Sequence, residues 1–228
     1  MKRSLSLAII TLMLVGAALC APPAWSQDDS VSASAARERV NRVTHVVEQM
    51  RRNADLSRLL KHAKGVFIIP QYRERGAVLG GESGGGVVLV RRHGAWSDPA
   101  FYNIGGASVG SQVGGERGAV AMLLMTHKAV ERFENANYGW SLNAKSGLTV
   151  ADYSSAAARH SDVIFWSSAR GLYAELTAGF TDISPDEGLD RAYYRRPADS
   201  RAILHGHMSD SHSADALREA LAIRVATR

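Results

Sequence analysis

The stretch Ala63-Lys64-Gly65-Val66-Phe67-Ile68-Ile69-Pro70 divides the chain into two regions of different hydrophobic periodicity. Its centre, residues 66–69, is a continuous run of β-branched and aromatic or aliphatic side chains between a glycine and a proline. A run of this length with these flanks is typical of a buried strand. We expect a buried strand here that ends at Pro70, with helical sequence before it and glycine-rich β sequence after it.

The region before this strand has the spacing of amphipathic helices. Apolar residues recur every three or four positions over residues 34–62, and arginines and lysines fill the positions between them. Asn53-Ala54-Asp55 is predicted to divide the region into two helices, with Asp55 as a cap on the second. The small and polar residues 27–33 are predicted to form a flexible leader.

The region after the strand is rich in glycine and in β-forming residues as far as Thr126. Glycines within strand patterns indicate bulges, tight bends or the close approach of another backbone. Further elements are predicted along the rest of the chain: a helix at 127–135 with Thr126 as its N-cap, strands at 138–150, 163–166 and 172–180, a loop at 181–188 and a closing helix at 214–225. The expected fold is a single α+β domain over residues 34–228. Its curved, glycine-rich antiparallel sheet or partial barrel carries the N- and C-terminal helices packed on it.

The first 26 residues have the pattern of a secretory signal peptide. Lys2 and Arg3 form a positive start, and the uncharged apolar run 5–19 is shorter than the roughly 20 residues of a membrane span. Ala24-Trp25-Ser26 offers small residues at the positions that signal peptidase reads, so we expect cleavage after Ser26. The chain is therefore expected to be exported to the periplasm.

Cys20 leaves a second outcome open. It stands at the end of the apolar run, where a lipid-modified cysteine belongs, and acyl chains on it would anchor the protein to a membrane. Leu19 disfavours this outcome, because the residue before such a cysteine is normally small. Cleavage after Ser26 would instead remove the one cysteine of the chain, and with it any disulfide or cysteine–metal chemistry.

The charge of the mature chain is a mild positive excess. The whole sequence carries a formal +5, and Lys2 and Arg3 are the only charged residues of the signal, which leaves +3. Such an excess suits anionic surfaces but lacks the concentrated basic stripe of nucleic-acid-binding proteins. We expect no nucleic-acid partner.

Motifs of catalysis and ligand binding are present only in part, so we expect neither an enzyme nor a cofactor. Residues 81–85 and 106–110 both spell G-x-S-x-G, but their sequence context is extended rather than the strand-to-helix turn of a serine nucleophile. The glycine-rich residues 80–86 lack the Lys-Ser/Thr of a phosphate-binding P-loop, and a turn is the simpler interpretation. His205, His207, Asp210 and His212 lack the spacing of a metal site, so no metal is expected.

Several segments of the chain occur in the order found in one known family. They are residues 63–70, the glycine stretch 80–86 with Val87–Val90, Trp96-Ser97-Asp98-Pro99-Ala100-Phe101-Tyr102, residues 106–114, Leu124–Val130 and Ala169–Ala174. Together they resemble the SYLF domain, also called the Ysc84 actin-binding domain, from Ala36 to the C-terminal helix. The resemblance implies binding rather than catalysis: eukaryotic members bind phosphoinositides and membranes, and some bind actin. An exported bacterial member would not meet actin, so we expect no actin partner.

Six arginines are the candidate binding residues. Arg73, Arg75, Arg91 and Arg92 are predicted in turns that could form an anion-binding rim, and Arg51 and Arg52 belong to the basic N-terminal helices. Those helices could lie on an anionic membrane, or they could pack their apolar stripe on the sheet and leave the charges in solvent. The leading hypothesis is a non-enzymatic envelope module that binds anionic lipid or a membrane surface. The alternative is a structural or protein-interaction module without a lipid role.

Overall fold

The computed structural model describes residues 25–75, 80–108, 117–136, 138–169, 180–206, 208 and 212–222. Its helices are α1 (Trp25–Arg51), α2 (Ala54–His62), α3 (His127–Glu134), α5 (Glu187–Tyr194), α6 (Ser200–His205) and α7 (His212–Leu221), with 3-10 turns η1 (Ala144–Ser146) and η2 (Ala156–His160). Its strands are β1 (Gly65–Arg75), β2 (Gly80–Arg92), β3 (Ala95–Trp96), β4 (Ala100–Ser108), β5 (Arg117–Leu124), β6 (Trp140–Leu142), β7 (Val150–Asp152), β8 (Val163–Ser167) and β9 (Phe180–Pro185). The expected signal peptide and Cys20 lie outside the described residues, as does the predicted strand over 172–179.

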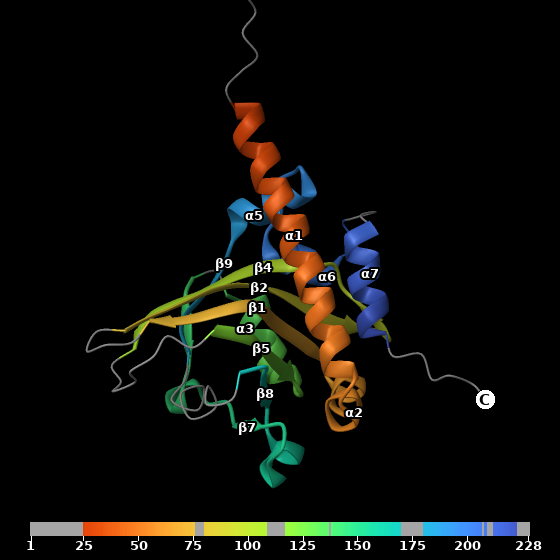
Figure 1. Ribbon diagram of the computed structural model, residues 1–228, viewed down its shortest axis with the longest axis vertical. Helices are drawn as coiled ribbons and strands as arrows, with labels where there is room; N and C mark the ends of the chain where they lie inside the picture. Colours follow the sequence, from red (N-terminus) through yellow and green to blue (C-terminus); the bar gives the residue numbers. More distant parts are fainter. Residues whose placement is uncertain are drawn as a thin grey trace, which may run out of the picture.

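A single curved sheet organises the described part of the chain (Figure 1). Its strand order is β6-β9-β4-β2-β1-β5-β8-β7, and β3 pairs with β2. The pairs are antiparallel except for β7 and β8, which are parallel. The predicted α+β class and curved sheet with helices from both termini are confirmed.

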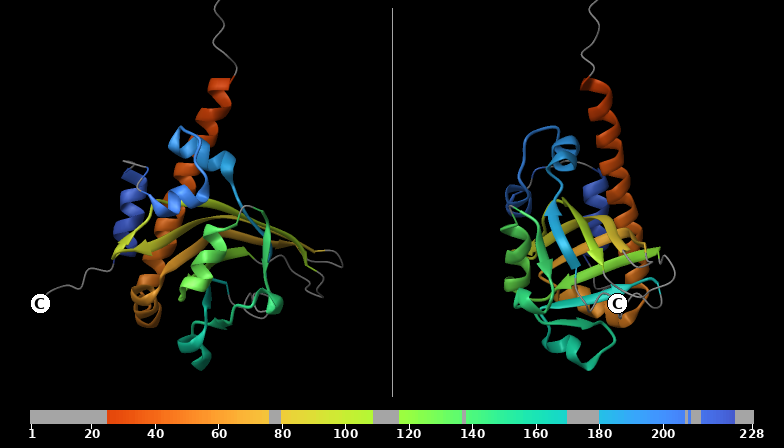
Figure 2. Two further views of the ribbon diagram at one scale, coloured as in Figure 1. Left: turned by 180° about the vertical axis from the view of Figure 1, so that it is seen from behind. Right: turned by 90° about the vertical axis from the view of Figure 1, so that its left-hand side faces the viewer.

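Strand β1 is buried on both faces over residues 65–69, which explains the continuous apolar sequence there. Successive side chains of a strand point to opposite faces. Val66 and Ile68 belong to the core under α1, α2 and α7, whereas Phe67 and Ile69 belong to the core under α3 and α6. The right-hand view of Figure 2 shows α1 and α3 on opposite sides of the sheet.

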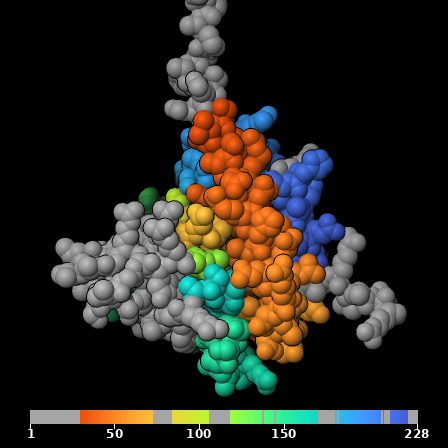
Figure 3. Space-filling model, viewed as in Figure 1, coloured from red at the N-terminus to blue at the C-terminus, as the bar shows by residue number. Residues whose placement is uncertain are grey.

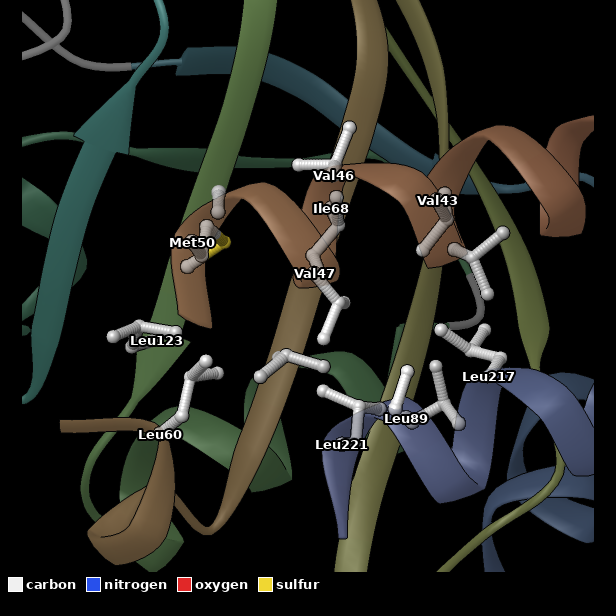
Figure 4. Packing of buried hydrophobic residues seen from close by; sticks show 14 of the residues in the cluster. Val43, Val46, Val47, Met50, Leu60, Ile68, Leu89, Leu123, Leu217 and Leu221 are labelled. Atoms are coloured by element: carbon white, nitrogen blue, oxygen red, sulfur yellow. The ribbon is translucent and has the colours of Figure 1, made fainter. Parts of the chain in front are cut away.

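The first of these cores joins the two ends of the chain. Leu217 and Leu221 of α7 lie beside Val47 of α1 over the sheet, and all three are fully buried (Figure 4). Each such side chain stabilises the fold by about 1.5–3 kcal/mol relative to an exposed one. The apolar stripe of the N-terminal helices therefore packs on the sheet. None of the helices in the described ranges is long and apolar enough to cross a membrane.

Aromatic rings fill the opposite core. Phe133 of α3 lies 5.3 Å from Phe67, 5.5 Å from Tyr102 and 5.1 Å from Trp140 between ring centroids, in edge-to-face arrangements. The Tyr102 hydroxyl donates to the Phe133 carbonyl oxygen at 2.6 Å. The ring contacts and this hydrogen bond hold α3 against the centre of the sheet.

A buried carboxylate holds the C-terminal segment to the sheet. Asp98 is fully buried, forms an ion pair with Arg218 of α7 and accepts a hydrogen bond from the Met208 backbone N–H. The neighbouring Ser97 hydroxyl accepts from the Val90 N–H at 3.0 Å. The Trp96–Phe101 segment noted in the sequence is therefore a structural junction between β2, β4 and α7.

Two predicted element ends near the start of the domain are wrong. Strand β1 does not end at Pro70 but continues to Arg75, with the pairing register shifting between Ile68 and Arg73 because proline has no N–H for the ladder. The cap of α2 is Asn53 rather than Asp55, and its side-chain oxygen accepts from the N–H groups of Asp55 and Leu56.

Four other predicted segments differ from the structure because tertiary pairing decided them. Residues 27–33, predicted as a flexible leader, are part of helix α1. The predicted strand 138–150 is divided into β6, η1 and the start of β7, and the predicted loop 181–188 contains β9 and the start of α5. The glycine stretch 80–86 lies in β2 rather than in a turn.

Two glycines of β2, Gly84 and Gly86, are explained by the close approach of β1. A Cβ on Gly86 would lie 2.5 Å from Phe67 Cε2 and 2.6 Å from the Ile68 carbonyl oxygen, and one on Gly84 would lie 2.8 Å from Ile69 Cγ2. Backbone and aromatic core atoms cannot move aside without disturbing β1. Glycine at these positions is therefore a packing requirement.

Gly86→Ala should destabilise the fold by about 1–3 kcal/mol, the usual result of overpacking a filled core. Urea unfolding followed by circular dichroism measures the change. Gly188→Ala on α5 is the control: its Cβ would meet only Asp186 Oδ1, at 3.7 Å, so it should be neutral or slightly stabilising. Equal stability of Gly86→Ala and the parent chain would contradict the packing explanation.

Candidate functional site

The six arginines proposed from the sequence do not form one site. In the β1–β2 ladder Gly65 pairs with Val90 and Arg75 pairs with Gly81. Arg73 and Arg75 therefore lie at the opposite end of this ladder from Arg91 and Arg92, about 30 Å away at 3.3 Å per residue. The two pairs of arginines cannot share a rim.

Two of the six arginines bind the C-terminal ends of helices. Arg91 donates to the carbonyl oxygens of Lys61 and Leu60 at the end of α2, and its guanidinium lies 4.5 Å from the centre of the Trp96 ring. Arg51 donates to the Ala220 carbonyl oxygen of α7 at 3.1 Å. Cations are favourable at helix C-termini, where carbonyl groups lack partners within the helix. These side chains therefore have a structural role.

The remaining members differ in exposure. Arg92 forms an ion pair with Glu134, which is buried in α3, and donates to His205 Nε2 at 2.9 Å. Arg52 is exposed, and its side chain makes no ion pair with any described residue. Neither arginine lies with Arg73 or Arg75, and Arg52 has no partner that would define a site.

The structure instead gathers a different set of arginines in a groove between α1 and α5. The groove has a volume of about 860 Å³. Its lining includes Arg37 of α1, Arg191 of α5, and Arg195 and Arg196 directly after α5. We call it the arginine groove. Figure 3 shows α1 as an exposed ridge with the light-blue α5 region beside its upper half.

The arginine groove is rich in cations without carboxylate partners. Arg37, Arg191 and Arg195 are exposed and form no ion pair within the described ranges, and Arg196 donates to the Met208 carbonyl oxygen at 3.3 Å. Arg195 ends α5 in the left-handed conformation, with φ of 54°. Guanidinium groups present several N–H donors to carboxylate or phosphate. The groove is therefore suited to binding an anionic group.

Asp186 fixes the position of α5 against α1 and β4. One carboxylate oxygen caps α5 by accepting from the Leu189 N–H at 3.1 Å, and the other accepts from Asn103 Nδ2 at 3.0 Å. Arg39 of α1 lies 3.6 Å from the same carboxylate. Burial lowers the pKa of Arg39, and the charge of Asp186 opposes that shift. These contacts connect both walls of the arginine groove to the sheet.

A second carboxyl group holds the inner side of α5. Asp190 is fully buried and accepts from the Phe101 N–H at 3.0 Å and from the Ser200 hydroxyl at 3.3 Å. Burial raises its pKa to about 8, and the two hydrogen bonds only partly offset that effect. Asp190 therefore connects the packing of α5 to pH.

The motifs of catalysis and metal binding do not contribute to the arginine groove. Ser83 and Ser108 both lie on paired strands, Ser83 opposite Gly105 and Ser108 opposite Gly80. Among the described residues, no three His, Cys, Asp or Glu side chains gather as metal ligands would, and His207 and Asp210 lie outside those residues.

Sequence patterns missed the arginine groove because the predicted loop 181–188 included the first two residues of α5 and no element was predicted over the rest of that helix. The run Arg191-Ala192-Tyr193-Tyr194-Arg195-Arg196 carries the available signal: two tyrosines that face the core, flanked by three arginines. Arg37 looked like any other solvated position of a basic helix. Only the packing of α5 on α1 brings it to the other three.

Comparisons with known proteins give a consistent set of relatives. A family model described as Ysc84, Las17-binding protein actin regulator, matches residues 105–223. Protein YSC84 of Saccharomyces cerevisiae is 28% identical over 175 residues, which are 73% of this chain and 37% of the relative. LAS seventeen-binding protein 3 of the same species is 28% identical over 175 residues, 73% of this chain and 38% of the relative. The chain thus spans less than two fifths of these relatives. No solved structure matches the chain significantly.

Asp190 should make the stability of the fold depend on pH. Its pKa is about 8 in the folded chain and about 3.9 when unfolded, so the folded state binds the proton more tightly and loses stability as pH rises between these values. Asp190→Asn removes the titration while keeping an oxygen for the Phe101 N–H. Urea unfolding gives the free energy of unfolding of both chains at about pH 5 and pH 8.5. Relative to the parent chain, the variant should be more stable at the higher pH than at the lower pH.

The control for this measurement is Asp55→Asn, which changes an exposed carboxyl group on α2. It should keep the pH dependence of the parent chain. If Asp190→Asn also kept that dependence, the buried carboxyl group would not be its source.

Proposed function

We propose, from the premise that the chain belongs to the Ysc84 family of Las17-binding protein actin regulators, that it is a non-enzymatic binding module that engages an anionic membrane surface. The observation that carries this proposal is the arginine groove, where none of the four arginines has an ion-pair partner among the described residues. The placement of Ser83 and Ser108 on paired strands supports a binding role over a catalytic one.

The arginine groove alone would have a low affinity for an anionic membrane, and a second attachment would raise that affinity. Each arginine near an anionic leaflet contributes about 1 kcal/mol, so four contribute about 4 kcal/mol, roughly a millimolar dissociation constant. Stable membrane binding usually takes two signals, such as an acyl chain with a basic patch. Ser30, Ser32 and Arg37 line the groove, a short distance along the chain from Cys20. A lipid on Cys20 would hold the groove close to a bilayer.

The proposed location rests on the predicted signal peptide of the first 26 residues. Export to the periplasm, or anchoring through Cys20, would bring the chain to envelope membranes. We expect neither actin nor a partner of the kind named for LAS seventeen-binding protein 3 in either place. We therefore do not extend those partners to this chain.

A protein-interaction role is the second candidate, and one observation favours it. Tyr138 is 86% exposed and lines a cavity of about 500 Å³ with Trp140, Lys128 and Arg132. Tyrosine, tryptophan and arginine are enriched at protein interfaces. The name of LAS seventeen-binding protein 3 describes a relative that binds a protein.

Vesicle co-sedimentation tests the membrane proposal. The mature chain, as the producing cell processes it, is mixed with vesicles of phosphatidylcholine alone or with added phosphatidylglycerol. Binding should require the anionic lipid and weaken at high salt. The triple variant Arg191→Gln, Arg195→Gln, Arg196→Gln should bind roughly a hundredfold more weakly, the loss of about 1 kcal/mol per cation.

A charge-matched variant separates the arginine groove from net charge. Arg58, Arg159 and Arg201 are exposed and lie outside the groove lining, and replacing all three with glutamine should leave binding close to that of the parent chain. If the two triple variants lost the same amount of vesicle binding, overall charge rather than the arginine groove would explain the binding. Absence of binding to anionic vesicles would reject the membrane role and favour the protein-interaction candidate.

A further inference from the structure

A second basic cavity lies at the end of the sheet, between the β2–β3 hairpin and α3. Its volume is about 410 Å³, within the usual range for small-ligand pockets. Its lining residues come from four places in the sequence: Lys64; Val90, Arg91, Arg92 and His93; His127; and Val130, Glu131 and Glu134. We call it the hairpin cavity. Its lining shares no residue with the arginine groove.

The backbone fixes the walls of the hairpin cavity. The Lys64 N–H donates to the Leu124 carbonyl oxygen at 2.8 Å, and the Lys64 carbonyl oxygen accepts from the Arg91 N–H at 2.7 Å. His93 and Gly94 form a two-residue turn with φ of 51° and 84°, the positive values that a tight hairpin of this type requires. The opposite wall begins at His127, the first residue of α3, whose N-cap is Thr126.

The lining of the hairpin cavity contains more cationic side chains than carboxylates. Lys64, Arg91 and Arg92 face two carboxylates, and one of these, Glu134, is committed to Arg92 and to His205 at 3.5 Å. Lys64 makes no ion pair with any residue that the structure describes. The Nε atoms of Arg91 and Arg92 are buried, and neither has a hydrogen-bond partner within the described ranges.

Buried donors without protein acceptors favour an anionic ligand, because leaving a charged donor unpaired costs more than pairing it. His93 and His127 add imidazole nitrogens, and the N-terminus of α3 adds a favourable field for negative charge. A tetrahedral group with several oxygens can accept from donors on both walls at once, which a planar carboxylate cannot do as fully.

We propose that the hairpin cavity binds a phosphate group. Lys64 supplies charge and His127 a hydrogen bond from opposite walls, and Arg92 in the same lining is held by its ion pair with Glu134. Glu131 borders the same cavity and disfavours ligands with large negative charge, so a single phosphomonoester is the expected class. The phosphate can belong to a soluble compound or to a lipid head group.

Two ligands distinguish these sources in experiments on the mature chain. Inorganic phosphate is titrated by isothermal calorimetry, and vesicles containing phosphatidic acid are tested by co-sedimentation against phosphatidylcholine vesicles. The double variant Lys64→Gln, His127→Gln should weaken binding by about tenfold or more, the usual result of losing charge-assisted hydrogen bonds. The matched variant Lys145→Gln, His160→Gln, at two exposed positions outside the cavity, should bind as the parent chain does.

The outcomes separate this proposal from the membrane role of the arginine groove. A soluble phosphate ligand is supported if the parent chain binds inorganic phosphate saturably. The Lys64/His127 variant should then lose this binding, and the arginine-groove triple variant should keep it. Weaker binding of the Lys64/His127 variant than of the Lys145/His160 variant to phosphatidic acid vesicles, with no binding of inorganic phosphate by the parent chain, supports a lipid head group. Equal binding of either ligand by the Lys64/His127 and Lys145/His160 variants, or no binding of either ligand, overturns the proposal. Unchanged thermal unfolding of each variant confirms that the fold is intact.

Discussion

The burial of β1 on both faces is the constraint on which the rest of the structure depends. Val66 and Ile68 require helices on one side, and Phe67 and Ile69 require them on the other. Helices α1, α2 and α7 therefore cover one face of the sheet, and α3 and α6 cover the opposite face. The neighbouring strand β2 comes so close that Gly84 and Gly86 have no room for a side chain. Burial of this one strand therefore fixes both the layering of the domain and the glycine-rich sequence beside it.

Several buried or half-buried polar groups of this domain attach helices to the sheet. Asp98 holds α7 through Arg218, Asp186 and Asp190 hold α5, and Arg91 binds the end of α2. Each is buried or half-buried and has defined partners, as buried polar groups require. Much of the charge that looked functional in the sequence is therefore used for assembly. Two groups of the cations that remain lie at the edges of helix contacts, in the arginine groove and the hairpin cavity.

Both proposed binding regions follow from this arrangement. The arginine groove forms because the ion pair between Asp186 and Arg39 holds α5 beside α1. The hairpin cavity forms where the Arg91 N–H donates to the Lys64 carbonyl oxygen, just before β1 begins. The groove is open, with exposed guanidinium groups, which suits a surface. The cavity is smaller and contains buried donors without acceptors, which suits a compact ligand. Their different shapes explain why we assign them different kinds of anionic partner.

The sequence by itself determined the α+β class, the buried strand at 66–69, the N-cap at Thr126 and the family, because periodicity, capping residues and local motifs act over short distances. It left bulges, tight bends and close approach open for the strand glycines, and the structure shows close approach at Gly84 and Gly86. Only the tertiary structure decided that β1 continues through Pro70 and that residues 181–188 form most of β9 and the start of α5. It also decided that Arg73 and Arg75 lie far from Arg91 and Arg92. Those outcomes depend on strand register and helix packing between residues far apart in the chain. The arginine groove has the same origin, since Arg37 and Arg195 meet only when α5 docks on α1.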